Sequence, residues 1–448
     1  MSDAVELEIQ SLDGRARGVA LREGKRFFIE GALPGERVRA AIERDEPNYA
    51  VGSVRTVLRA SSQRVDPRCP HFGVCGGCVL QHADAAAQVA FKQRELEEAL
   101  QRGGLRPARM LPPLRGPDWA YRHRARLALR FVPSRGGVLL GFHERKSSFV
   151  ADIRVCHVLP AAVSDLLEPL HGLVAGLSIP HRIPQIEVAA GDGGAVVLVL
   201  RHLLPLGDGD LDQLRLFAAR HGVAWWLQPG GPETAAPLGA AKDCAEGGED
   251  GAMRDELVYG LPRFGLAMRF RPTDFIQSNL AANRSLVSRA LDLLEAGPDD
   301  RVLDLFCGLG NFTLPLATQA KEVLGVEGSA GLLDRARRAA ADNGLLARTR
   351  YACTDLFKVD AGWLRAQGRF DLMLLDPPRE GARALAEALA TLAPAERPRR
   401  IVYVSCNPST LARDAAIMAH RGGYRLKACG LVNMFPHTAH VESVSVLE

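Results

Sequence analysis

The C-terminal third of the chain alternates between short apolar runs and longer amphipathic stretches. The runs after residue 299 read "RVLDLF", "EVLGVE", "RTRYACTD", "FDLMLLD" and "RIVYVSC". Each of these except the last is followed by a helical stretch, which predicts an α/β fold with a parallel, doubly wound sheet. The tail, from "YRLKACGLVNMF" to "HVESVSVL", holds two further strands with no helix between them. At least one of the two should therefore run antiparallel at the end of the sheet.

Residues 5–58 have a different rhythm, in which short alternating strands such as "GVALREGKRFFIEG" and "GERVRAAIER" are broken by glycine. This spacing predicts a small β-barrel or sandwich. Basic residues are frequent in the segment: Arg15, Arg17, Arg22, Lys25 and Arg26. They fit a solvated basic face or the binding face of an OB-type nucleic-acid barrel, and this stretch alone does not choose between the two.

The middle of the chain predicts a helix over residues 83–100 and then a strand over 119–131, "WAYRHRARLALRF". At a period of two residues one face of this strand is apolar. The opposite face carries Arg122, Arg124, Arg126 and Arg130. Crowded arginines call for a compensating polyanion, and guanidinium groups suit phosphates and stacked bases. We therefore favour an RNA-binding strand over a strand face that is merely solvated.

Composition limits the class of protein. A chain of 448 residues predicts two or three domains, and 47% hydrophobic with 24% charged residues is typical of soluble globular proteins. The N-terminus lacks an apolar leader and the longest apolar runs are too short for a membrane span, so we expect a cytoplasmic protein without membrane contact. There, nine cysteines favour metal binding or catalysis over disulfides. The net charge of +4 permits an acidic partner. Residues 228–256, rich in Gly, Pro and acidic residues, predict a surface loop or hairpin extension.

A cofactor turn is predicted in "VLDLFCGLGNFTLPLA", residues 302–317, where a strand meets a helix. Gly308 and Gly310 allow a ligand to approach the backbone closely. The third glycine of the dinucleotide fingerprint is missing, so this turn alone is weak evidence. The missing glycine also leaves little room for a pyrophosphate. S-adenosylmethionine therefore fits better than NAD, and the succession of strands and helices is the topology expected of a Rossmann-like methyltransferase.

Carboxylates follow successive strands of the predicted sheet. Asp304 lies at the end of the first, Glu327 closes the second and Asp355 closes the third. Glu327 can accept hydrogen bonds from both ribose hydroxyls, and Asp355 can meet the exocyclic amine of adenine. The alternative is that these residues only cap strand ends. We favour a ligand crevice, because open α/β sheets bind ligands at this edge.

A thiol stands where the fifth strand ends, at Cys406 in "IVYVSCNP", and Asp376 ends the neighbouring fourth strand in "DPPR". Carbon 5 of uracil becomes nucleophilic only after a thiolate adds to carbon 6, so a thiol at this place indicates pyrimidine chemistry. Glu442 is the candidate base for the carbon 5 proton, with a structural salt bridge as its alternative. We disfavour a metal pair at His437 and His440 for want of further ligands. The other cysteines of the domain are predicted to pack: Cys307, Cys353 and Cys429.

Over about residues 270–448 the chain resembles the RNA (uracil-5-)-methyltransferase family. The resemblance is carried, in order, by "DFIQSN", "DLFCGLGNFTLPLA", "LLDPPREGA", "VYVSCNPSTLARD" and "FPHTAHVESVSVL". It implies that Cys406 is the nucleophile and Glu442 the proton acceptor. It also implies cofactor contacts from Gln277, Phe306, Asn311, Glu327, Asp355 and Asp376, with Asp376 also contacting the flipped uracil. Position 355 departs mildly from the family, whose members also carry Asn there.

A cysteine cluster lies upstream, spaced C-x5-C-x2-C in "RCPHFGVCGGCVLQH" and followed by a distant cysteine in "DIRVCHVL". Its members are Cys69, Cys75, Cys78 and Cys156. Four thiolates suit zinc or an iron–sulfur cluster, and the unpaired distal cysteine tilts the choice slightly toward iron–sulfur. The pattern resembles that of the ribosomal-RNA branch of the family, which implies a 4Fe-4S cluster. Cys244 lies outside the pattern.

The N-terminal segment resembles a TRAM domain, an OB-like RNA-binding barrel. The resemblance then implies a TRAM barrel at 1–62, a central α+β iron–sulfur domain with an RNA-binding sheet at 63–270 and a methyltransferase domain at 271–448. This combination is similar to the branch that methylates uridine 1939 of 23S ribosomal RNA, whereas the transfer-RNA branch typically lacks the barrel and the cluster. The alternatives are the same chemistry on transfer RNA or on another 23S uridine, and a non-catalytic RNA-binding assembly factor. We expect a monomer with no obligate protein partner.

Overall fold

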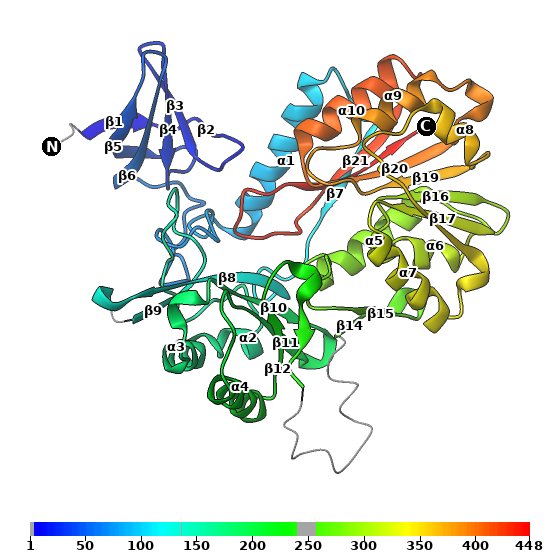
Figure 1. The fold of residues 1–448 in the computed structure, drawn as a ribbon. Coiled ribbons are helices and arrows are strands. Elements are labelled where there is room, and N and C mark those ends of the chain that lie inside the picture. The colour runs from blue at the N-terminus through cyan, green and yellow to red at the C-terminus, as the bar shows by residue number, and fades with distance from the viewer. Residues whose placement is uncertain (1–3, 136, 240–256) are drawn as a thin grey trace.

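A computed structural model describes residues 4–135, 137–239 and 257–448 of the chain. Cys244 and most of the loop predicted over 228–256 lie outside these residues. Figure 1 shows the chain passing from a small β-structure at its N-terminus through a central α/β unit into a large twisted sheet flanked by helices. Within the described ranges, none of the helices is long and apolar enough to cross a membrane.

The N-terminal strands form a six-stranded sheet in the order β1-β5-β6-β4-β3-β2. Its edge strands β1 and β2 are successive parts of one short stretch of chain, so the sheet closes on itself. Its core includes Leu7, Ile29, Val38 and Ala50. The structure thus has a small closed β-sheet where the strand spacing predicts one. The strands are β1 (Ala4–Glu8), β2 (Ser11–Leu12), β3 (Gly18–Arg22), β4 (Lys25–Glu30), β5 (Arg37–Asp45) and β6 (Tyr49–Arg59).

The central unit is a second six-stranded sheet, ordered β13-β12-β11-β10-β8-β9. Helices α3 and α4 pack against it, and α3 lies close to β9. The strands are β8 (Arg124–Val132), β9 (Gly137–Gly141), β10 (Gln185–Ala190), β11 (Val196–Arg201), β12 (Ala224–Gln228) and β13 (Ala236–Pro237). The helices are α2 (Ala161–Ser164), α3 (Leu167–Gly176) and α4 (Asp208–His221).

The arginine-bearing strand β8 has the predicted two-sided pattern, but it begins at Arg124 rather than at residue 119. Its arginine face is partly compensated from within the protein. Glu187 on the neighbouring strand β10 accepts from Arg126 Nε at 3.0 Å and from Arg124 Nη2 at 3.3 Å. The expectation that only a polyanion could offset this crowding is therefore wrong for these two residues. Arg130 remains exposed on the same face.

The C-terminal sheet has eight strands in the order β18-β17-β16-β19-β20-β22-β21-β7. Strands β16 to β20 are parallel, and β22 runs antiparallel to both β20 and β21, as the helix-free tail predicts. A separate hairpin, β14 and β15, precedes the sheet. The strands are β14 (Leu257–Leu261), β15 (Leu266–Phe270), β16 (Arg301–Leu305), β17 (Glu322–Glu327), β18 (Thr349–Cys353), β19 (Leu372–Leu375), β20 (Arg400–Ser405), β21 (Leu426–Val432) and β22 (Glu442–Leu447). The helices are α5 (Leu280–Leu294), α6 (Thr313–Ala317), α7 (Ala330–Asp342), α8 (Ala361–Ala366), α9 (Arg383–Thr391) and α10 (Pro408–His420).

One segment of the predicted central domain belongs by its packing to this C-terminal sheet. Helix α1 (Ala85–Arg102) packs on α10, and strand β7 (Arg109–Leu114) pairs in parallel with β21. In Figure 1 both lie beside the C-terminal strands. The predicted domain limits of 63–270 and 271–448 therefore need this correction. Strand β7 contains two consecutive prolines, which suit an edge strand and hide it from strand prediction.

Candidate active site

The predicted site residues gather at one edge of the C-terminal sheet. Glu327 is the last residue of β17, and Asp355, Asp376 and Cys406 follow β18, β19 and β20 within two residues. Because these strands are parallel neighbours, their carboxyl ends open onto one crevice. Asp304 lies one residue inside β16 and behaves differently from the others.

Asp304 is enclosed by the protein. The side chain is fully buried, and its Oδ2 accepts a hydrogen bond from Thr313 Oγ1 at 2.5 Å, so it holds the start of α6. Burial raises the pKa of this carboxyl to about 7. Asp304 thus differs from the other carboxylates, because it is enclosed, with one oxygen bonded to Thr313 and the other without a hydrogen-bond partner among the described residues.

The glycine turn after β16 has the backbone shape needed for a close ligand approach. Phe306, Gly308 and Gly310 all have positive φ, at 63°, 54° and 90°. The amide of Gly308 donates to Glu327 Oε2 at 3.3 Å, and the amide of Ser329 donates to Glu327 Oε1 at 3.1 Å. Both carboxylate oxygens of Glu327 are thus held in place by backbone amides beside the turn.

Asn311 is fixed from two neighbouring elements. Its Oδ1 accepts from Asn283 Nδ2 at 2.9 Å and from Tyr259 Oη at 3.0 Å, while its Nδ2 donates to Asn283 Oδ1 at 2.9 Å. Asn283 lies on α5 and Tyr259 on β14. Sequence reasoning missed both residues. Their only signal is that each is a polar group placed in an otherwise apolar stretch.

Asp355 and two aromatic residues mark the outer end of the crevice. Asp355 Oδ1 accepts from the amide of Phe357 at 3.1 Å, and Oδ2 pairs with Lys358 Nζ at 2.8 Å. The rings of Phe306 and Phe357 lie 5.7 Å apart between centroids. The arrangement offers an apolar wall with a carboxylate beside it.

Cys406 and Glu442 lie next to one another across the antiparallel pair of β20 and β22. Ser405 pairs with Ser443, so continuing the register by one residue sets Cys406 opposite Glu442. Burial raises the pKa of the Cys406 thiol to about 12, and the charges of Glu442 and Asp376 contribute to the rise. Within the described part of the chain Glu442 takes part in no ion pair, which removes the alternative of a structural salt bridge.

Asp376 completes this group of acidic and thiol side chains. Burial raises its pKa to about 7, while a hydrogen bond from Gln277 acts in the opposite direction. Burial and the charge of Asp376 also raise the pKa of Glu442, which is buried. Arg379 opposes these effects, because its positive charge lowers the pKa of both Cys406 and Glu442.

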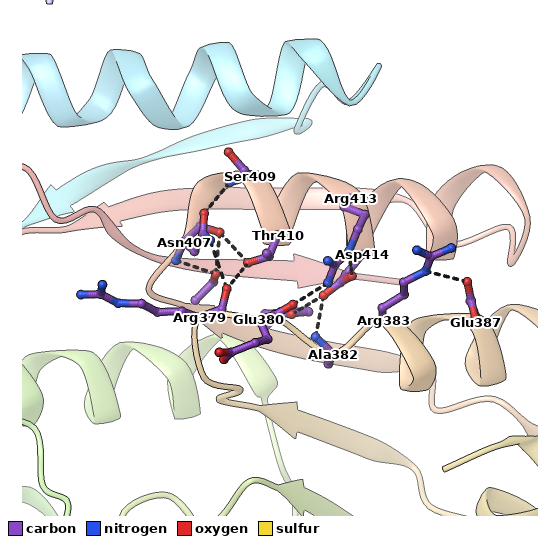
Figure 2. Close-up of polar contacts among 12 residues, drawn as sticks. Arg379, Glu380, Ala382, Arg383, Glu387, Asn407, Ser409, Thr410, Arg413 and Asp414 are labelled. Atoms are coloured by element: carbon purple, nitrogen blue, oxygen red, sulfur yellow. Dashed lines mark hydrogen bonds and ion pairs between the residues drawn. The ribbon is translucent and has the colours of Figure 1, made fainter. Parts of the chain in front are cut away.

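The loops after β19 and β20 are tied to one another, as Figure 2 shows. Asn407 Nδ2 and Thr410 Oγ1 donate to the carbonyl of Arg379 at 3.0 and 3.3 Å, and Arg413 Nη2 donates to the carbonyl of Glu380 at 2.8 Å. Asp414 Oδ2 accepts from the amide of Ala382 at 2.7 Å. The guanidinium of Arg379 extends away from these contacts (Figure 2). These bonds couple the position of the Asp376 loop to that of the thiol.

The two histidines of the tail have separate environments. His440 Nδ1 lies 3.1 Å from Arg379 Nη2, and burial with this neighbouring charge lowers the His440 pKa to about 4. His437 instead stacks on Trp119, with ring centroids 3.9 Å apart. Within the described ranges, neither histidine belongs to a group of three or more possible metal ligands.

The four clustered cysteines line one small cavity together with Phe72, Phe142 and Ile153. These cysteines are Cys69, Cys75, Cys78 and Cys156, and none forms a disulfide. Burial raises the thiol pKa of Cys78 to about 11 and of Cys156 to about 12. Across the residues that the structure describes, no three His, Cys, Asp or Glu side chains are placed to hold a single metal ion.

A basic cleft of about 480 Å³ connects the barrel with the catalytic edge. It runs from the barrel past the cysteine segment and ends at His440. Two carboxylates, Glu30 and Glu144, also line it, and Glu30 pairs with Lys146 at 2.8 Å. The positive residues outnumber them: Arg15, Arg17, Arg122, Arg145 and Lys146. A cleft of this charge suits a nucleic-acid backbone.

Comparison with known proteins agrees with this geometry. Residues 264–448 match the family described as tRNA (Uracil-5-)-methyltransferase. A protein of Bordetella avium named 23S rRNA (uracil(1939)-C(5))-methyltransferase RlmD is 64% identical over 443 residues, covering 99% of this chain and 90% of that protein. One of the same name from Ralstonia pickettii is 52% identical over 461 residues and covers both chains fully. The fold and the site thus define the class, the uracil-C5 methyltransferases that use S-adenosylmethionine. Within that class, the chain belongs to the RlmD family.

A solved structure has the same overall fold. The tRNA (uracil-54, C5)-methyltransferase of Pyrococcus abyssi, in complex with S-adenosyl-L-homocysteine, matches with a TM-score of 0.72 at 21% identity. The match covers 99% of this chain and 100% of that one. A transfer-RNA enzyme can therefore share nearly the whole architecture, so the presence of the barrel does not by itself distinguish the two branches.

Proposed function

We propose that this protein transfers a methyl group from S-adenosylmethionine to carbon 5 of a uridine in 23S ribosomal RNA, and that the uridine is number 1939, as the names of its relatives state for them. The observation that carries the proposal is the convergence of Cys406, Glu442 and Asp376 beside the cofactor turn. This is the set of groups that methylation of a pyrimidine carbon needs, whereas methylation of an amine needs no thiol.

Cys406 is the proposed nucleophile. Its thiolate adds to carbon 6 of the flipped uracil, and the electron pair of the ring double bond moves to carbon 5 and the carbonyl at carbon 4. Bound S-adenosylmethionine supplies an electrophilic methyl group and leaves as S-adenosylhomocysteine. Two features favour the thiolate: the charge of Arg379, and the position of Cys406 directly before the N-terminus of α10.

Glu442 is the proposed proton acceptor. After the methyl group has joined carbon 5, the carboxylate takes the carbon 5 proton, the ring double bond re-forms and the bond from sulfur to carbon 6 breaks. Its place beside Cys406 puts the base on the same side of the crevice as the thiol. Burial and the nearby Asp376 raise the Glu442 pKa, which makes it a stronger base once it is ionised.

Asp376 and Gln277 are proposed to hold the uracil, with Asp376 also touching the cofactor. A carboxyl whose pKa is about 7 can donate to a uracil carbonyl or accept from N3–H. Their mutual hydrogen bond pre-organises both side chains. The remaining cofactor contacts are assigned by their places in the crevice: Glu327 to the ribose, Asp355 to the adenine amine, and Phe306 and Asn311 to the wall and floor of the adenosine site.

The RNA is proposed to lie in the basic cleft between barrel and catalytic edge. The barrel is assigned as a TRAM domain, and β8 contributes its exposed arginines to the same track. Unstacking a base costs a few kcal/mol, so extraction of one uridine from a folded RNA requires that the protein bind the flanking RNA backbone. The competing assignment, a non-catalytic RNA-binding factor, gives no reason for a half-buried thiol beside two acidic side chains.

The cavity of the four cysteines is proposed to hold a 4Fe-4S cluster through Cys69, Cys75, Cys78 and Cys156. The four thiols line one small cavity and share it without forming disulfides, a placement that suits a thiolate-bound cluster. A single zinc ion needs its ligands about 2.3 Å from one point. The role proposed is structural, since no step above transfers an electron.

Two measurements test these assignments. Iron and acid-labile sulfide should each approach four per chain in anaerobically purified protein, with the visible absorption typical of such clusters. Zinc in their place would contradict the assignment of a 4Fe-4S cluster. Incubation with tritiated methyl donor should label a 23S fragment that contains uridine 1939 and spare a fragment with cytidine there. Label found only in transfer RNA would contradict the assignment of 23S ribosomal RNA as the substrate.

A further inference from the structure

The segment that leads into Glu442, residues 433–441, has few hydrogen bonds within itself. Val432 of β21 pairs with Glu442 of β22, so residues 433–441 are the link of an antiparallel hairpin. Of the main-chain bonds of residues 433–437, three stay within the hairpin: the Met434 amide donates to Val432, and the amide and hydroxyl of Thr438 both donate to the Phe435 carbonyl. The other main-chain bonds of residues 433–437 go to other parts of the chain, Leu114, Tyr121 and Asn279 among them. The position of the link therefore depends on its partners.

Helix α1 supplies two of these partners from one face. Lys92 Nζ donates to Asn433 Oδ1 at 2.8 Å and to the carbonyl of Phe435 at 2.7 Å. Gln88 Oε1 accepts from the amide of His437 at 2.7 Å, and its Nε2 lies 3.1 Å from His437 Nδ1. Gln88 and Lys92 are four residues apart, so both side chains reach the same target.

The segment after the clustered cysteines holds the link at the same point. The amides of Val79 and Leu80 both donate to the carbonyl of His437, at 2.8 and 2.9 Å. Gln88 Nε2 in turn donates to the carbonyl of Leu80 at 3.1 Å. His437 has a φ of 65°, a conformation that a histidine adopts at a cost and keeps where its surroundings hold it.

Burying these two polar side chains is costly. Gln88 and Lys92 are each only 2% exposed, and burial lowers the pKa of Lys92 to about 7. An apolar pair at these positions would pack against the neighbouring core of α1, which includes Leu96 and Leu100. Polar groups kept at this cost indicate a requirement for directional bonds.

We propose that Gln88 and Lys92 are positioning residues, which set the place of the Glu442 carboxylate through the link 433–441. The inference rests on the proposed role of Glu442 as proton acceptor. Cys406 directly follows β20, outside the link, and its backbone position is set by that strand and by α10. We call the contacts of Gln88 and Lys92 with the link the clamp. Weakening the clamp should leave the attack of the thiolate on carbon 6 and the methyl transfer in place, and should slow removal of the carbon 5 proton. The methylated RNA would then stay bonded to Cys406.

The test compares Lys92→Met and Gln88→Leu with Arg94→Met, a control on the exposed face of the same helix where Arg94 pairs with Glu98. Holoenzyme reacts with methyl-labelled donor and the 23S fragment, and denaturing gels separate free RNA from RNA bonded to protein. In both clamp variants we expect kcat to fall about 10- to 100-fold, with single-turnover methylation within about threefold of wild type. Labelled adduct should accumulate. Lys92→Gln, which can still donate to one oxygen, should recover part of kcat.

The possible results distinguish the positioning role of Gln88 and Lys92 from the role of Glu442 as proton acceptor. Adduct that accumulates in Glu442→Gln but in neither clamp variant overturns the positioning role alone. Absence of adduct in Glu442→Gln overturns the role of Glu442 and the positioning role with it. A clamp variant whose kcat and single-turnover rate fall together, without adduct, shows a merely structural contact and also overturns the proposal. Should Lys92→Met melt below the assay temperature, Lys92→Gln carries the same comparison.

Discussion

Cys406 and Glu442 are held beside one another by the register of two antiparallel strands. Ser405, the residue before Cys406, pairs with Ser443, the residue after Glu442, and Ser443 Oγ donates to the carbonyl of Ser405 at 3.3 Å. The register of the two strands thus sets the backbone separation of the thiol and the carboxylate. The antiparallel insertion of β22 beside β20 is what makes the parallel sheet suitable for this chemistry.

Arg379→Met should make the Cys406 thiol less reactive. Burial raises the thiol pKa to about 12, and Arg379 is the positive charge that opposes this rise. Removing it should raise the pKa further and reduce the thiolate fraction at a given pH, so alkylation of Cys406 by iodoacetamide at pH 8 should slow by about 3- to 10-fold. Mass spectrometry of the Cys406 peptide gives the rate.

The control for this variant is Arg383→Met, four residues further on. Arg383 pairs with Glu387 on α9 and is not among the groups that shift the thiol pKa (Figure 2). Its alkylation rate should equal that of wild type. Equal or faster alkylation in Arg379→Met would contradict the electrostatic role of Arg379.

Glu327→Gln should weaken binding of S-adenosylmethionine while leaving the fold intact. The carboxylate is held by the amides of Gly308 and Ser329, and an amide side chain cannot accept from both of these and from two ribose hydroxyls. Loss of a charge-assisted hydrogen bond costs about 1.5–3 kcal/mol, so Kd should rise about 10- to 100-fold by calorimetry. Glu322→Gln, at the other end of β17, should bind like wild type. Unchanged affinity in Glu327→Gln would remove Glu327 from the cofactor site.

Asp304→Asn should change the pH dependence of stability. The pKa of Asp304 rises from 3.8 to about 7 on folding, so its contribution to stability is present below pH 4 and is lost as the pH rises to 7. The asparagine variant has no such titration. Between pH 4 and 7 its free energy of unfolding should therefore gain roughly 2–4 kcal/mol relative to wild type, as measured by urea denaturation. A difference that stays constant with pH would contradict the buried, protonated carboxyl.

Arg130→Gln should weaken RNA binding by an electrostatic route. Arg130 lies exposed on the face of β8 that we assign to the RNA track. Removal of one phosphate contact should lower affinity for all RNA sequences alike and reduce the slope of log K against log salt by about one. Arg220→Gln, on α4, should leave the slope unchanged. An unchanged slope for both variants would place the RNA elsewhere.

Much of the catalytic sheet could be predicted from the sequence, because buried parallel strands are continuous apolar runs and their carboxyl ends carry the functional groups. Strand β7 could not be predicted, because two consecutive prolines normally argue against a strand. Its pairing with β21 also joins segments more than three hundred residues apart. The position of Asp304 is a similar case. The sequence does not show that this carboxyl is fully buried or that it bonds to Thr313 at the start of the next helix.

The supporting contacts of the site were also beyond sequence reasoning. Gln88 and Lys92 look like polar positions of an ordinary amphipathic helix, yet both are buried against the link that leads to Glu442. The role of Tyr259 and Asn283 likewise becomes visible only in the structure, where both donate hydrogen bonds to Asn311 Oδ1. Such contacts arise from tertiary packing between distant segments. The monomeric state and the cytoplasmic location stay predictions.

The central claim is that the sulfur of Cys406 bonds to carbon 6 of a uracil before the methyl group moves. An RNA fragment carrying 5-fluorouridine at the target tests it most directly, because fluorine cannot leave as the proton does and the reaction should stop at the adduct. With S-adenosylmethionine present, wild-type protein should form a protein–RNA complex that survives denaturation, with the RNA attached to the Cys406 peptide. Cys406→Ala should form none and should methylate nothing. Methyl transfer by that variant, or attachment at another residue, would contradict the account.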